Sequence, residues 1–554
     1  MDVRQNIRTA LERALAESGF AEPKVTLEHP ADLKNGDYSS GVALQYAKQA
    51  ATAPRALAEK IVSSLGTIEG VAKIEVAGAG FINFYLTPAA LAEAVEMARA
   101  EDMWGSNAIH ADKTIMMEYT DPNPFKEFHI GHLVPNALGE SVSRLFQFSG
   151  ANVKRANYQG DVGIHVAKSI FILLEKGITE PTIADLSVAY PEGSKRYEED
   201  AEAKTAIDAL NKTIYAKSDE KVNALYAKGR KLSLDHFEDI YKMLGTKFDY
   251  YFFESEAGPI GTKIVREHPE IFPESEGAVI FRGEEHGLHT RVFLNKQGLP
   301  TYEAKELGLA RMKEGACAFD LTITITGNEQ GGYFKVVMKA MELALPELRG
   351  KLAYKTNGML RFAEGKMSSR TGNIIRGEDL LNDLAAAAKE RASESRADDA
   401  GKLSMEIAVA AIKYQILKQA FSKDIIFDRE RALSLEGDSG PYLQYAHARA
   451  HQLVEKAKEQ GVAPAVDSNI EPTNLTRLLH RFPEAVEYAA AHTEPHLLTN
   501  YLIEFGAAFN SWYAQVQVLD GTPEAAHKVA LVDAVRKTLK NGLWILGIPA
   551  PERM

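Results

Sequence analysis

The feature that most constrains the fold is a strand-to-helix turn that ends near residue 130. A short apolar strand pattern at 114–120 is followed by a polar stretch at 121–128 and a helical pattern at 131–150. The tetrapeptide His-Ile-Gly-His occupies 129–132, at the start of that helix. Free backbone N–H groups and the helix dipole at such a position favour a phosphate. The sequence therefore predicts an anion-binding turn between a strand and a helix.

The side chains of this turn suit the handling of ATP. Gly131 would let a flat base approach the backbone, and His129 and His132 can donate hydrogen bonds to oxyanions as charge builds on a phosphorus. For four residues taken alone, two helix-capping or surface histidines are the ordinary alternative. A second motif changes that balance.

The second motif is Gly-Lys-Met-Ser-Ser-Arg-Thr-Gly-Asn at 365–373. One lysine, hydroxyls and an arginine between glycines suit a loop that closes over a triphosphate. Taken alone, this segment would be interpreted as a basic solvated loop. In combination and in this order, the two motifs resemble the two signatures of class I aminoacyl-tRNA synthetases, HIGH and KMSKS.

The composition is that of a large globular enzyme. The chain has 554 residues, of which 45% are hydrophobic and 25% charged, as is ordinary for several folded domains. Cys317 is the single cysteine, which excludes an internal disulfide and a multi-cysteine zinc site. Residues 1–20 are charged throughout and predict neither a secretory signal nor a membrane span. We expect a soluble, cytoplasmic protein without zinc.

Net charge does not identify a nucleic-acid partner. The formal net charge is −12, whereas nucleic-acid binders usually carry a basic surface. A large enzyme can confine its basic residues to one face, and net charge is silent about their distribution. Net charge alone therefore does not decide whether this protein binds RNA.

The pattern of apolar residues predicts a separate N-terminal α/β domain at 1–105. A helical run is expected at 43–65, and alternating apolar residues predict strands at 71–76 and 81–86 that meet at an Ala-Gly-Ala-Gly turn.

From residue 106 to about 380, strand and helix patterns alternate, as expected for a parallel Rossmann-like sheet with crossover helices. Between about 175 and 290 the sequence is polar and largely helical, which we interpret as an insertion. We expect the sheet to resume with the segment at 291–315 and the β-rich segment at 320–330.

Residues 381–554 are expected to form an all-α helical bundle. Pro441 fits the first turn of a helix behind Ser439. Apolar residues recur at helical spacing further on, and we interpret that stripe as bundle core: Leu498, Tyr501, Leu502, Phe505, Phe509 and Trp512. The predicted fold class is therefore a multidomain α/β protein with a Rossmann-like core, an N-terminal α/β domain and a C-terminal bundle.

Six segments together resemble the arginyl-tRNA synthetase family. They are EYTDPNPFKEFHIGHL, NYQGDVG, TYEAKELGLA, LEGDSGPYLQYAHARA, EFGAAFNSWY and the final GIPAPERM. The resemblance covers nearly the whole chain and is weakest between about 175 and 290. It implies a two-step reaction in which arginine and ATP give arginyl-adenylate, and the arginyl group then passes to the 2′-hydroxyl of the terminal adenosine of arginine tRNA.

The resemblance also implies roles for the two motifs. His129 and His132 would hold the phosphates in the transition state, Gly131 would face the adenine, and Lys366 would neutralise the departing pyrophosphate with substrate-bound Mg²⁺. The implied ATP site is completed by Gly327, Met367 and Ser368. The family is commonly monomeric.

One departure from the family pattern concerns the second lysine of KMSKS. Ser369 stands in its place here and is followed by Arg370. Arginyl enzymes that lack this lysine often carry another just before HIGH, and Lys126 occupies that position. Our hypothesis is that Lys126 supplies the missing charge as a fourth catalytic residue.

Arginine recognition needs acceptors, because the guanidinium presents five N–H donors in a planar fork and stays charged. The resemblance assigns this binding to Glu118 and Asn123 upstream of the HIGH motif, and to His129, Tyr302, Glu306 and Gln330. The family has an aspartate at the position of Glu306, and Glu303 is the alternative here.

The bundle resembles an anticodon-binding domain, and the implied tRNA contacts are Tyr442, Gln444, Tyr445 and Arg449. An aromatic ring can stack on an unpaired base and arginine can contact base edges or phosphates, although Tyr445 is equally suited to the core. In the N-terminal domain, Asn35, Tyr38 and Phe84 are tRNA contacts suggested by their chemistry alone, and ordinary folding roles suit these residues at least equally well.

The alternatives are other classes of protein. They are another class I synthetase, a small-molecule nucleotidyltransferase with a related histidine motif, and a non-catalytic tRNA-binding paralogue. Intact His129, His132 and Lys366 argue against the non-catalytic protein, which has no need of transition-state groups.

Overall fold

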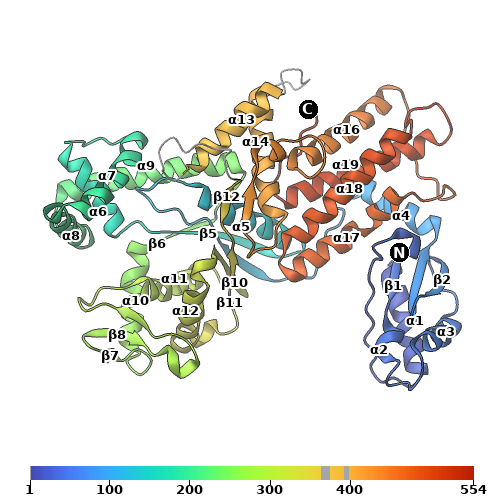
Figure 1. The fold of residues 1–554 in the computed structure, drawn as a ribbon, viewed down its shortest axis with the longest axis horizontal. Coiled ribbons are helices and arrows are strands. Elements are labelled where there is room, and N and C mark those ends of the chain that lie inside the picture. Colours follow the sequence, from blue (N-terminus) through green and yellow to red (C-terminus); the bar gives the residue numbers. More distant parts are fainter. Residues whose placement is uncertain (1, 364–374, 392–398) are drawn as a thin grey trace.

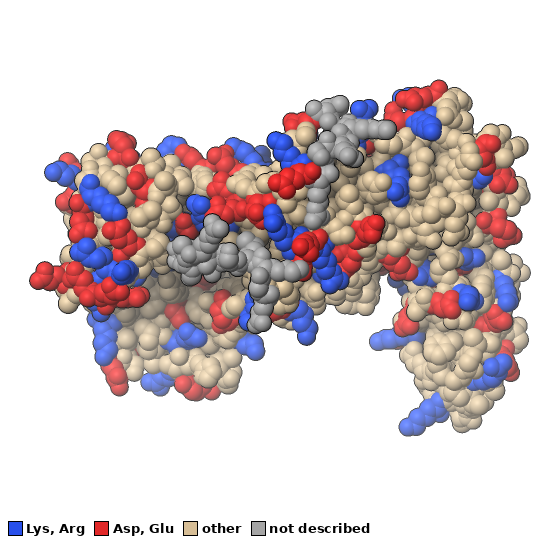
Figure 2. Space-filling model, turned by 45° about the horizontal axis from the view of Figure 1, so that its top comes forward, with Lys and Arg blue, Asp and Glu red and all other residues tan. Residues whose placement is uncertain are grey.

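The computed structural model describes residues 2–363, 375–391 and 399–554. Figure 1 shows an N-terminal unit at one end, a helical bundle beside it, a central sheet, and two lobes at the far end. Among the described residues, no helix has the length and apolar character needed to cross a membrane. Acidic and basic side chains are interspersed over the face drawn in Figure 2.

The N-terminal unit is a three-stranded antiparallel sheet in the order β1-β3-β2 with helices around it. The predicted strands at 71–76 and 81–86 are confirmed, and they pair across their glycine turn. The helical run expected at 43–65 is two helices, because Pro54 can only occupy a first turn. The elements are α1 (Val3–Glu17), β1 (Tyr38–Ser40), α2 (Val42–Tyr46), α3 (Pro54–Leu65), β2 (Val71–Ala77), β3 (Phe81–Leu86) and α4 (Pro88–Ala100).

The central sheet has five parallel strands in the order β11-β10-β4-β5-β6. Neighbouring side chains of β4 point to opposite faces, yet Met116 and Met117 are both fully buried, in two separate cores. The sheet is therefore covered on both sides, as parallel sheets require. Its strands are β4 (Thr114–Glu118), β5 (Asn152–Gln159), β6 (Tyr250–Phe253), β10 (Leu321–Gly327) and β11 (Leu352–Asn357).

Two expectations about the sheet were wrong. β6 lies inside the range expected to be an insertion, yet it is an edge strand of the sheet. The strand at 291–294 is β9, which joins a separate antiparallel sheet β7-β8-β9. A four-residue edge strand such as Tyr-Tyr-Phe-Phe carries too little periodicity to be recognised.

The segments between the core strands form crossover helices and the two lobes of Figure 1. The crossover helix after β4 is α5 (Ile130–Phe148). The upper lobe contains α6 (Ile164–Glu175), α7 (Ile183–Glu199), α8 (Ala201–Ala216) and α9 (Glu220–Leu244). The lower lobe contains α10 (Glu254–Glu267), β7 (Glu274–Ser275), β8 (Ala278–Phe281), β9 (Arg291–Leu294), α11 (Tyr302–Ala316) and α12 (Gly331–Ala344).

The C-terminal region is helical, as predicted. Ser439 caps α16 and Pro441 lies in its first turn. The predicted stripe on α18 is buried from Leu498 to Phe509, and Trp512 is half-buried. The elements are β12 (Leu360–Phe362), α13 (Gly377–Arg391), α14 (Ala400–Leu417), β13 (Ile425–Phe427), α15 (Arg429–Ala432), α16 (Gly440–Glu459), α17 (Asn474–His492), α18 (Pro495–Gln515) and α19 (Ala525–Ile545).

The bundle and one face of the central sheet share a single hydrophobic core. Leu138 and Val142 of α5 belong to the same cluster of buried side chains as Leu443 of α16 and Leu539 of α19. Helix α5 is therefore enclosed between the sheet and the bundle.

Candidate active site

The His-Ile-Gly-His turn is a closed hydrogen-bonded cap at the start of α5. His129 Nδ1 accepts a hydrogen bond from the Gly131 N–H at 3.0 Å, and the His129 N–H donates to His132 Nδ1 at 3.1 Å. The two rings stack with centroids 3.9 Å apart. A Cβ on Gly131 would lie 2.7 Å from the His129 ring, so only glycine fits there.

These hydrogen bonds determine which ring nitrogens can act as donors. Because each Nδ1 accepts, a neutral ring carries its proton on Nε2. Burial, with the nearby charge of Lys126, lowers the pKa of His129. Burial, His129 and Lys126 together hold the pKa of His132 well below its usual value. Both imidazoles are therefore neutral near pH 7, and each can donate from Nε2.

Lys126 lies close to this cap but is held by the upper lobe. Its Nζ is 4.9 Å from the ring centroid of Tyr190 on α7. Its charge also contributes to the low pKa of His165, about 3, which burial mainly causes. Tyr190 and His165 were not recognised from the sequence, because a single tyrosine in a helical insertion and a single helix-start histidine carry no distinctive pattern.

The second motif, with Lys366, Met367, Ser368, Ser369 and Arg370, lies outside the described residues. The segment that follows it pairs with the histidine cap. Ile130 N–H donates to the Ile375 carbonyl at 3.1 Å, and Gly377 N–H donates to the Phe128 carbonyl at 2.8 Å. The described chain after the second motif is thus attached to the first motif.

A group of carboxyls, of which Glu118 is buried and Glu306 and Asp121 are half-buried, lies at the end of β4 and along α11. Lys313 Nζ is 2.5 Å from Glu118 Oε2, and both side chains are buried. Burial, then Glu118, raises the pKa of Glu306 to about 8, and the same two causes raise the pKa of Asp121 well above its usual value. Three carboxyls thus share one ammonium, and this deficit of positive charge favours a bound cation.

The other predicted arginine contacts lie on α11 and between β4 and α5. Glu303 Oε1 is 3.4 Å from Arg291 Nη1, so its charge is directed to a different partner. Tyr302 is 66% exposed, and Lys305 Nζ lies 5.2 Å from its ring centroid. Asn123 Oδ1 accepts a hydrogen bond from Gly160 N–H at 2.9 Å.

Two further predicted residues lie at the carboxyl end of β10. Gly327 is the last residue of that strand, and its Cα pairs with Asn357 of β11. Gln330 is exposed in the turn that follows. The roles expected of Gly327 and Gln330 therefore rest on the family pattern.

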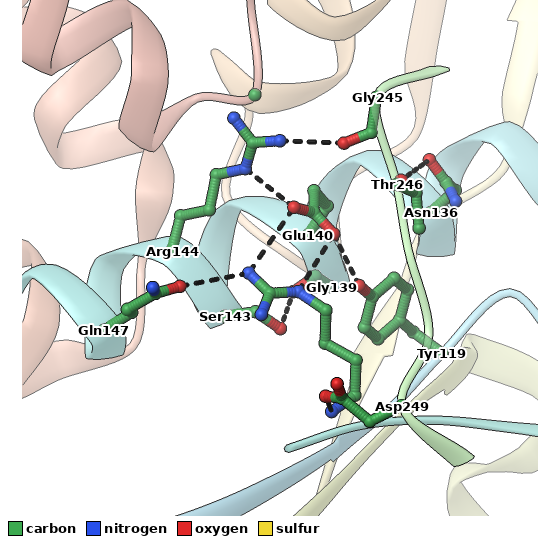
Figure 3. Close-up of polar contacts among 12 residues, drawn as sticks. Tyr119, Asn136, Gly139, Glu140, Ser143, Arg144, Gln147, Gly245, Thr246 and Asp249 are labelled. Atoms are coloured by element: carbon green, nitrogen blue, oxygen red, sulfur yellow. Dashed lines mark hydrogen bonds and ion pairs between the residues drawn. The ribbon is translucent and has the colours of Figure 1, made fainter. Parts of the chain in front are cut away.

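Helix α5 is held in place by one buried carboxylate (Figure 3). Glu140 accepts hydrogen bonds from Tyr119 Oη at 2.6 Å, Arg144 Nε at 2.6 Å and Arg155 Nε at 3.2 Å. Arg144 continues to the carbonyls of Gly245 at 2.8 Å and Trp544 at 3.0 Å. The network therefore joins α5 to the end of α9 and to the last helix of the bundle.

The predicted tRNA contacts of the bundle divide into half-buried and fully buried residues. Arg449 lies between the rings of Tyr445 and Tyr513, at 4.6 and 4.9 Å from their centroids, and donates to Asn510. Tyr442 is half-buried against the core. Tyr513 was missed, because the sequence does not show that α16 and α18 are adjacent.

Three suggested tRNA contacts need correction. Gln444 is fully buried, and its amide donates to the carbonyls of Glu406 and Pro549. Tyr38 is 1% exposed and donates to Glu484, and Phe84 is fully buried. These side chains fill the interior and have no surface for RNA, whereas Asn35 is exposed.

Three family profiles match the chain in sequence order. They are "Arginyl tRNA synthetase N terminal domain" at 1–86, "tRNA synthetases class I (R), catalytic domain" at 94–429, and "DALR anticodon binding domain" at 443–554. The chain belongs to the arginyl-tRNA synthetase family. Membership implies an ATP-using ligase with arginine and tRNA as partners, and it confirms the resemblance inferred from the sequence.

Individual arginyl-tRNA synthetases support the assignment along the whole chain. The arginine–tRNA ligase of Clostridium perfringens is 30% identical over 547 residues, covering 95% of this chain and 96% of that relative. The ligase of Chromobacterium violaceum is 30% identical over 577 residues and covers 100% of both. The solved arginyl-tRNA synthetase of Thermus thermophilus is 26% identical, with a TM-score of 0.82 and 100% coverage of both chains.

Proposed function

We propose that this chain activates L-arginine with ATP to arginyl-adenylate and transfers the arginyl group to the 2′-hydroxyl of the terminal adenosine of arginine tRNA. The observation that carries this proposal is the histidine cap at the start of α5, together with the carboxyls at the end of β4 and on α11, which have a deficit of positive charge. Adenylate formation is an in-line attack on the α-phosphorus, so positioning and charge stabilisation supply most of the catalysis.

In this proposal the cap and the second motif handle the ATP phosphates. His129 and His132 donate from Nε2 to oxygens on the α-phosphate, and Gly131 leaves room for the adenine. Gly327, Met367 and Ser368 complete the nucleotide site. Lys366 and Lys126 neutralise the pyrophosphate, with Mg²⁺ brought in on the nucleotide. The role proposed for Lys126 is supported by the effect of its charge, which lowers the pKa of both His129 and His132 in addition to the effect of burial.

The guanidinium of the substrate is assigned to the carboxyl group. Glu306 and Glu118 accept its N–H donors, while Lys313 limits how much negative charge is left uncompensated. Of the two alternative carboxyls, we assign the substrate guanidinium to Glu306, because Glu303 already pairs with Arg291. Asn123, Tyr302, His129 and Gln330 orient the remainder of the amino acid.

The bundle is proposed to contact the anticodon arm through Tyr442, Tyr445 and Arg449, extended by Tyr513. The domain limits of 1–105, 106–380 and 381–554, a monomeric state and a cytoplasmic location belong to the same proposal. Stacking on aromatic rings suits unpaired bases, and two of these rings already flank an arginine.

Arginine-dependent ATP–pyrophosphate exchange tests the function, measured with and without arginine tRNA and with lysine and citrulline as controls. Exchange with arginine alone among the three amino acids is the expected result. If exchange requires tRNA, the RNA completes the site. Absence of exchange in both conditions, with tRNA binding retained, would instead identify a non-catalytic tRNA-binding protein.

A further inference from the structure

Lys313 is a buried lysine beside the proposed arginine site. It lies in the last turn of α11, in the lower lobe of Figure 1, and its side chain is 5% exposed. Its Nζ is 2.5 Å from Oε2 of Glu118, the last residue of β4, whose side chain is 2% exposed. Buried lysines are rare and need a partner. The ion pair is therefore what allows both charges inside the protein.

Helix geometry places Lys313 on the same face of α11 as two of the proposed arginine contacts. Glu306 follows Tyr302 by four residues, and Lys313 follows Glu306 by seven, which is about two turns. Lys313 reaches the central sheet, where Thr324 of β10 is the register partner of Glu118. Glu306, Lys313 and Thr324 line one small cavity of about 30 Å³. The ion pair and Glu306 therefore belong to one site.

The cations around α11 are each committed to a different carboxyl. The ion pairs are Lys305–Glu254 at 2.5 Å, Arg291–Glu303 at 3.4 Å and Lys313–Glu118 at 2.5 Å. Within the ranges that the structure describes, Glu306 and Asp121 form no ion pair. Lys313 thus compensates the charge of Glu118, while Glu306 and Asp121 are left for a cation from outside the chain.

The ionisation of Glu306 depends on Lys313. Burial, then the charge of Glu118, raises the pKa of Glu306 to about 8, and Lys313 opposes that rise. The titratable groups that face Glu306 come from β4 and the loop after it, β5, α10, α11 and α12: Glu118, Asp121, Tyr158, Glu254, Glu303, Lys313 and Tyr333. Burial raises the pKa of both tyrosines well above the usual value, so they stay neutral. Lys313 is the cation in this set.

We propose that Lys313 is a positioning residue for arginine recognition: its ammonium holds Glu118 ionised and in place, so that Glu118 and Glu306 together accept the substrate guanidinium. Without this cation, the buried carboxyl of Glu118 takes up a proton, and a protonated carboxyl offers fewer acceptors to the planar fork. The site then loses its preference for the charged guanidinium over the uncharged ureido group of citrulline. This inference rests on the proposed function and names the residue that sets its selectivity for charge.

The test compares Lys313→Met with Lys313→Arg in the full-length chain. Titration calorimetry measures arginine and citrulline binding across the pH range, and pyrophosphate exchange gives the KM for arginine and for ATP. In Lys313→Met we expect the dissociation constant of arginine to rise about 10- to 100-fold near neutral pH, because a charge-assisted hydrogen bond to the substrate is lost. The preference for arginine over citrulline should fall by a similar factor.

The pH dependence supplies a readout that a structural role would not change. Lys313 opposes protonation of Glu306, so its removal should shift the pH at which arginine binding strengthens upward by about one unit or more. Lys313→Arg keeps the charge and should retain the pH dependence of the unmodified chain. The KM for ATP should change less than about twofold in both variants.

Two controls separate positioning from folding. Lys313→Met combined with Glu118→Gln removes both charges of the pair, so it should recover the urea unfolding midpoint lost in Lys313→Met without recovering the affinity for arginine. Arg311→Met removes an exposed cation from the same helix, where Arg311 pairs with Glu314. This variant should bind arginine with unchanged affinity and pH dependence.

The outcomes distinguish this inference from the proposed function. An unchanged pH dependence of arginine binding in a folded Lys313→Met variant would overturn the inference. Equal increases in the KM for arginine and for ATP at every pH would also overturn it, because they indicate a purely structural role. Arginine binding that depends on Lys313, in a chain that shows no exchange with or without tRNA, would support the inference and contradict the proposed catalysis.

Discussion

The charge state of a few residues determines how the site works. His129 and His132 are neutral donors because burial and Lys126 oppose a second proton on each ring. Fixed positive charge at the phosphates must therefore come from lysines, and Ser369 stands where the family has one of them. Lys126 is the described lysine that acts electrostatically on both histidines.

Replacing Lys126 tests this compensation. In Lys126→Ala we expect the rate of arginyl-adenylate formation to fall about 10- to 100-fold, because a charge on the departing pyrophosphate is lost. Lys126→Arg should recover part of the rate, and Lys221→Ala serves as a surface control on α9. Pyrophosphate exchange is the measurement. Unchanged exchange in Lys126→Ala, together with loss of exchange in Lys366→Ala, would show that the second charge is not needed.

The raised pKa of Glu306 predicts a pH dependence of arginine binding. Below about 8 the carboxyl is protonated and cannot form an ion pair, whereas the guanidinium stays charged. The KM for arginine should therefore fall about tenfold from pH 6.5 to pH 8.

Two variants distinguish the alternative carboxyls. Glu306→Gln should raise the KM for arginine and remove this pH dependence, while Glu303→Gln should retain it. The opposite pattern would assign the guanidinium to Glu303. Steady-state kinetics at saturating ATP provide the measurement.

At the scale of elements, the position of α5 depends on Glu140. The carboxylate is buried, and although burial opposes its charge, Arg144, Arg155 and Lys413 hold its pKa below the usual value. Lys413 itself is buried, donates to the carbonyls of Leu244 and Gly547, and has a pKa lowered to about 7 by burial. Cations from three elements thus surround one anion.

We therefore expect Glu140→Gln to lower the free energy of unfolding by about 3–5 kcal/mol, because it leaves buried cations without their partner. The matched control Glu342→Gln removes half of a partly exposed pair on α12, where Glu342 lies 3.8 Å from Lys339, and should cost about 1 kcal/mol or less. Urea unfolding measures both. An equal loss of unfolding free energy in Glu140→Gln and Glu342→Gln would show that the Glu140 network does not stabilise α5.

The order of strands and helices was predictable from apolar periodicity for β4, β5, β10 and the bundle, whose patterns are long. The positions of β6 and β9 could not be predicted in this way. Each strand has only four residues, and the sheet to which it belongs is determined by pairing with strands distant in sequence. The HIGH residues could be identified by their spacing. The sequence could not identify Lys313, Lys305 and Tyr513. Each of these residues joins the candidate site or the bundle surface only through contacts with residues distant in sequence.

At the scale of the whole molecule, the N-terminal unit is attached to the bundle by half-buried ion pairs. Glu484 of α17 accepts from Tyr38 at 2.5 Å and lies 3.3 Å from both Arg4 and His29. Burial opposes its charge, but these partners lower the pKa of Glu484 to about 2. Arg477 also pairs with Asp37.

The sign of that shift predicts acid release of the N-terminal unit. A depressed carboxyl pKa stabilises the contact above about pH 4.5, and this contribution is lost as pH falls toward 2. At pH 7, Glu484→Gln should raise amide exchange in α1 and β1 at least about tenfold, while Glu471→Gln should not. Protection unchanged in Glu484→Gln would show that apolar packing alone holds the unit.

The single core shared by α5 and the bundle limits how this chain can be divided. A cut between the central sheet and the bundle would expose two complementary apolar faces, each prone to self-association. The bundle is therefore not an independently exchangeable domain. A fragment that contains the bundle should be soluble only when the fragment that contains the central sheet is supplied with it. Exchange of bundles between relatives would have to carry α5 with it.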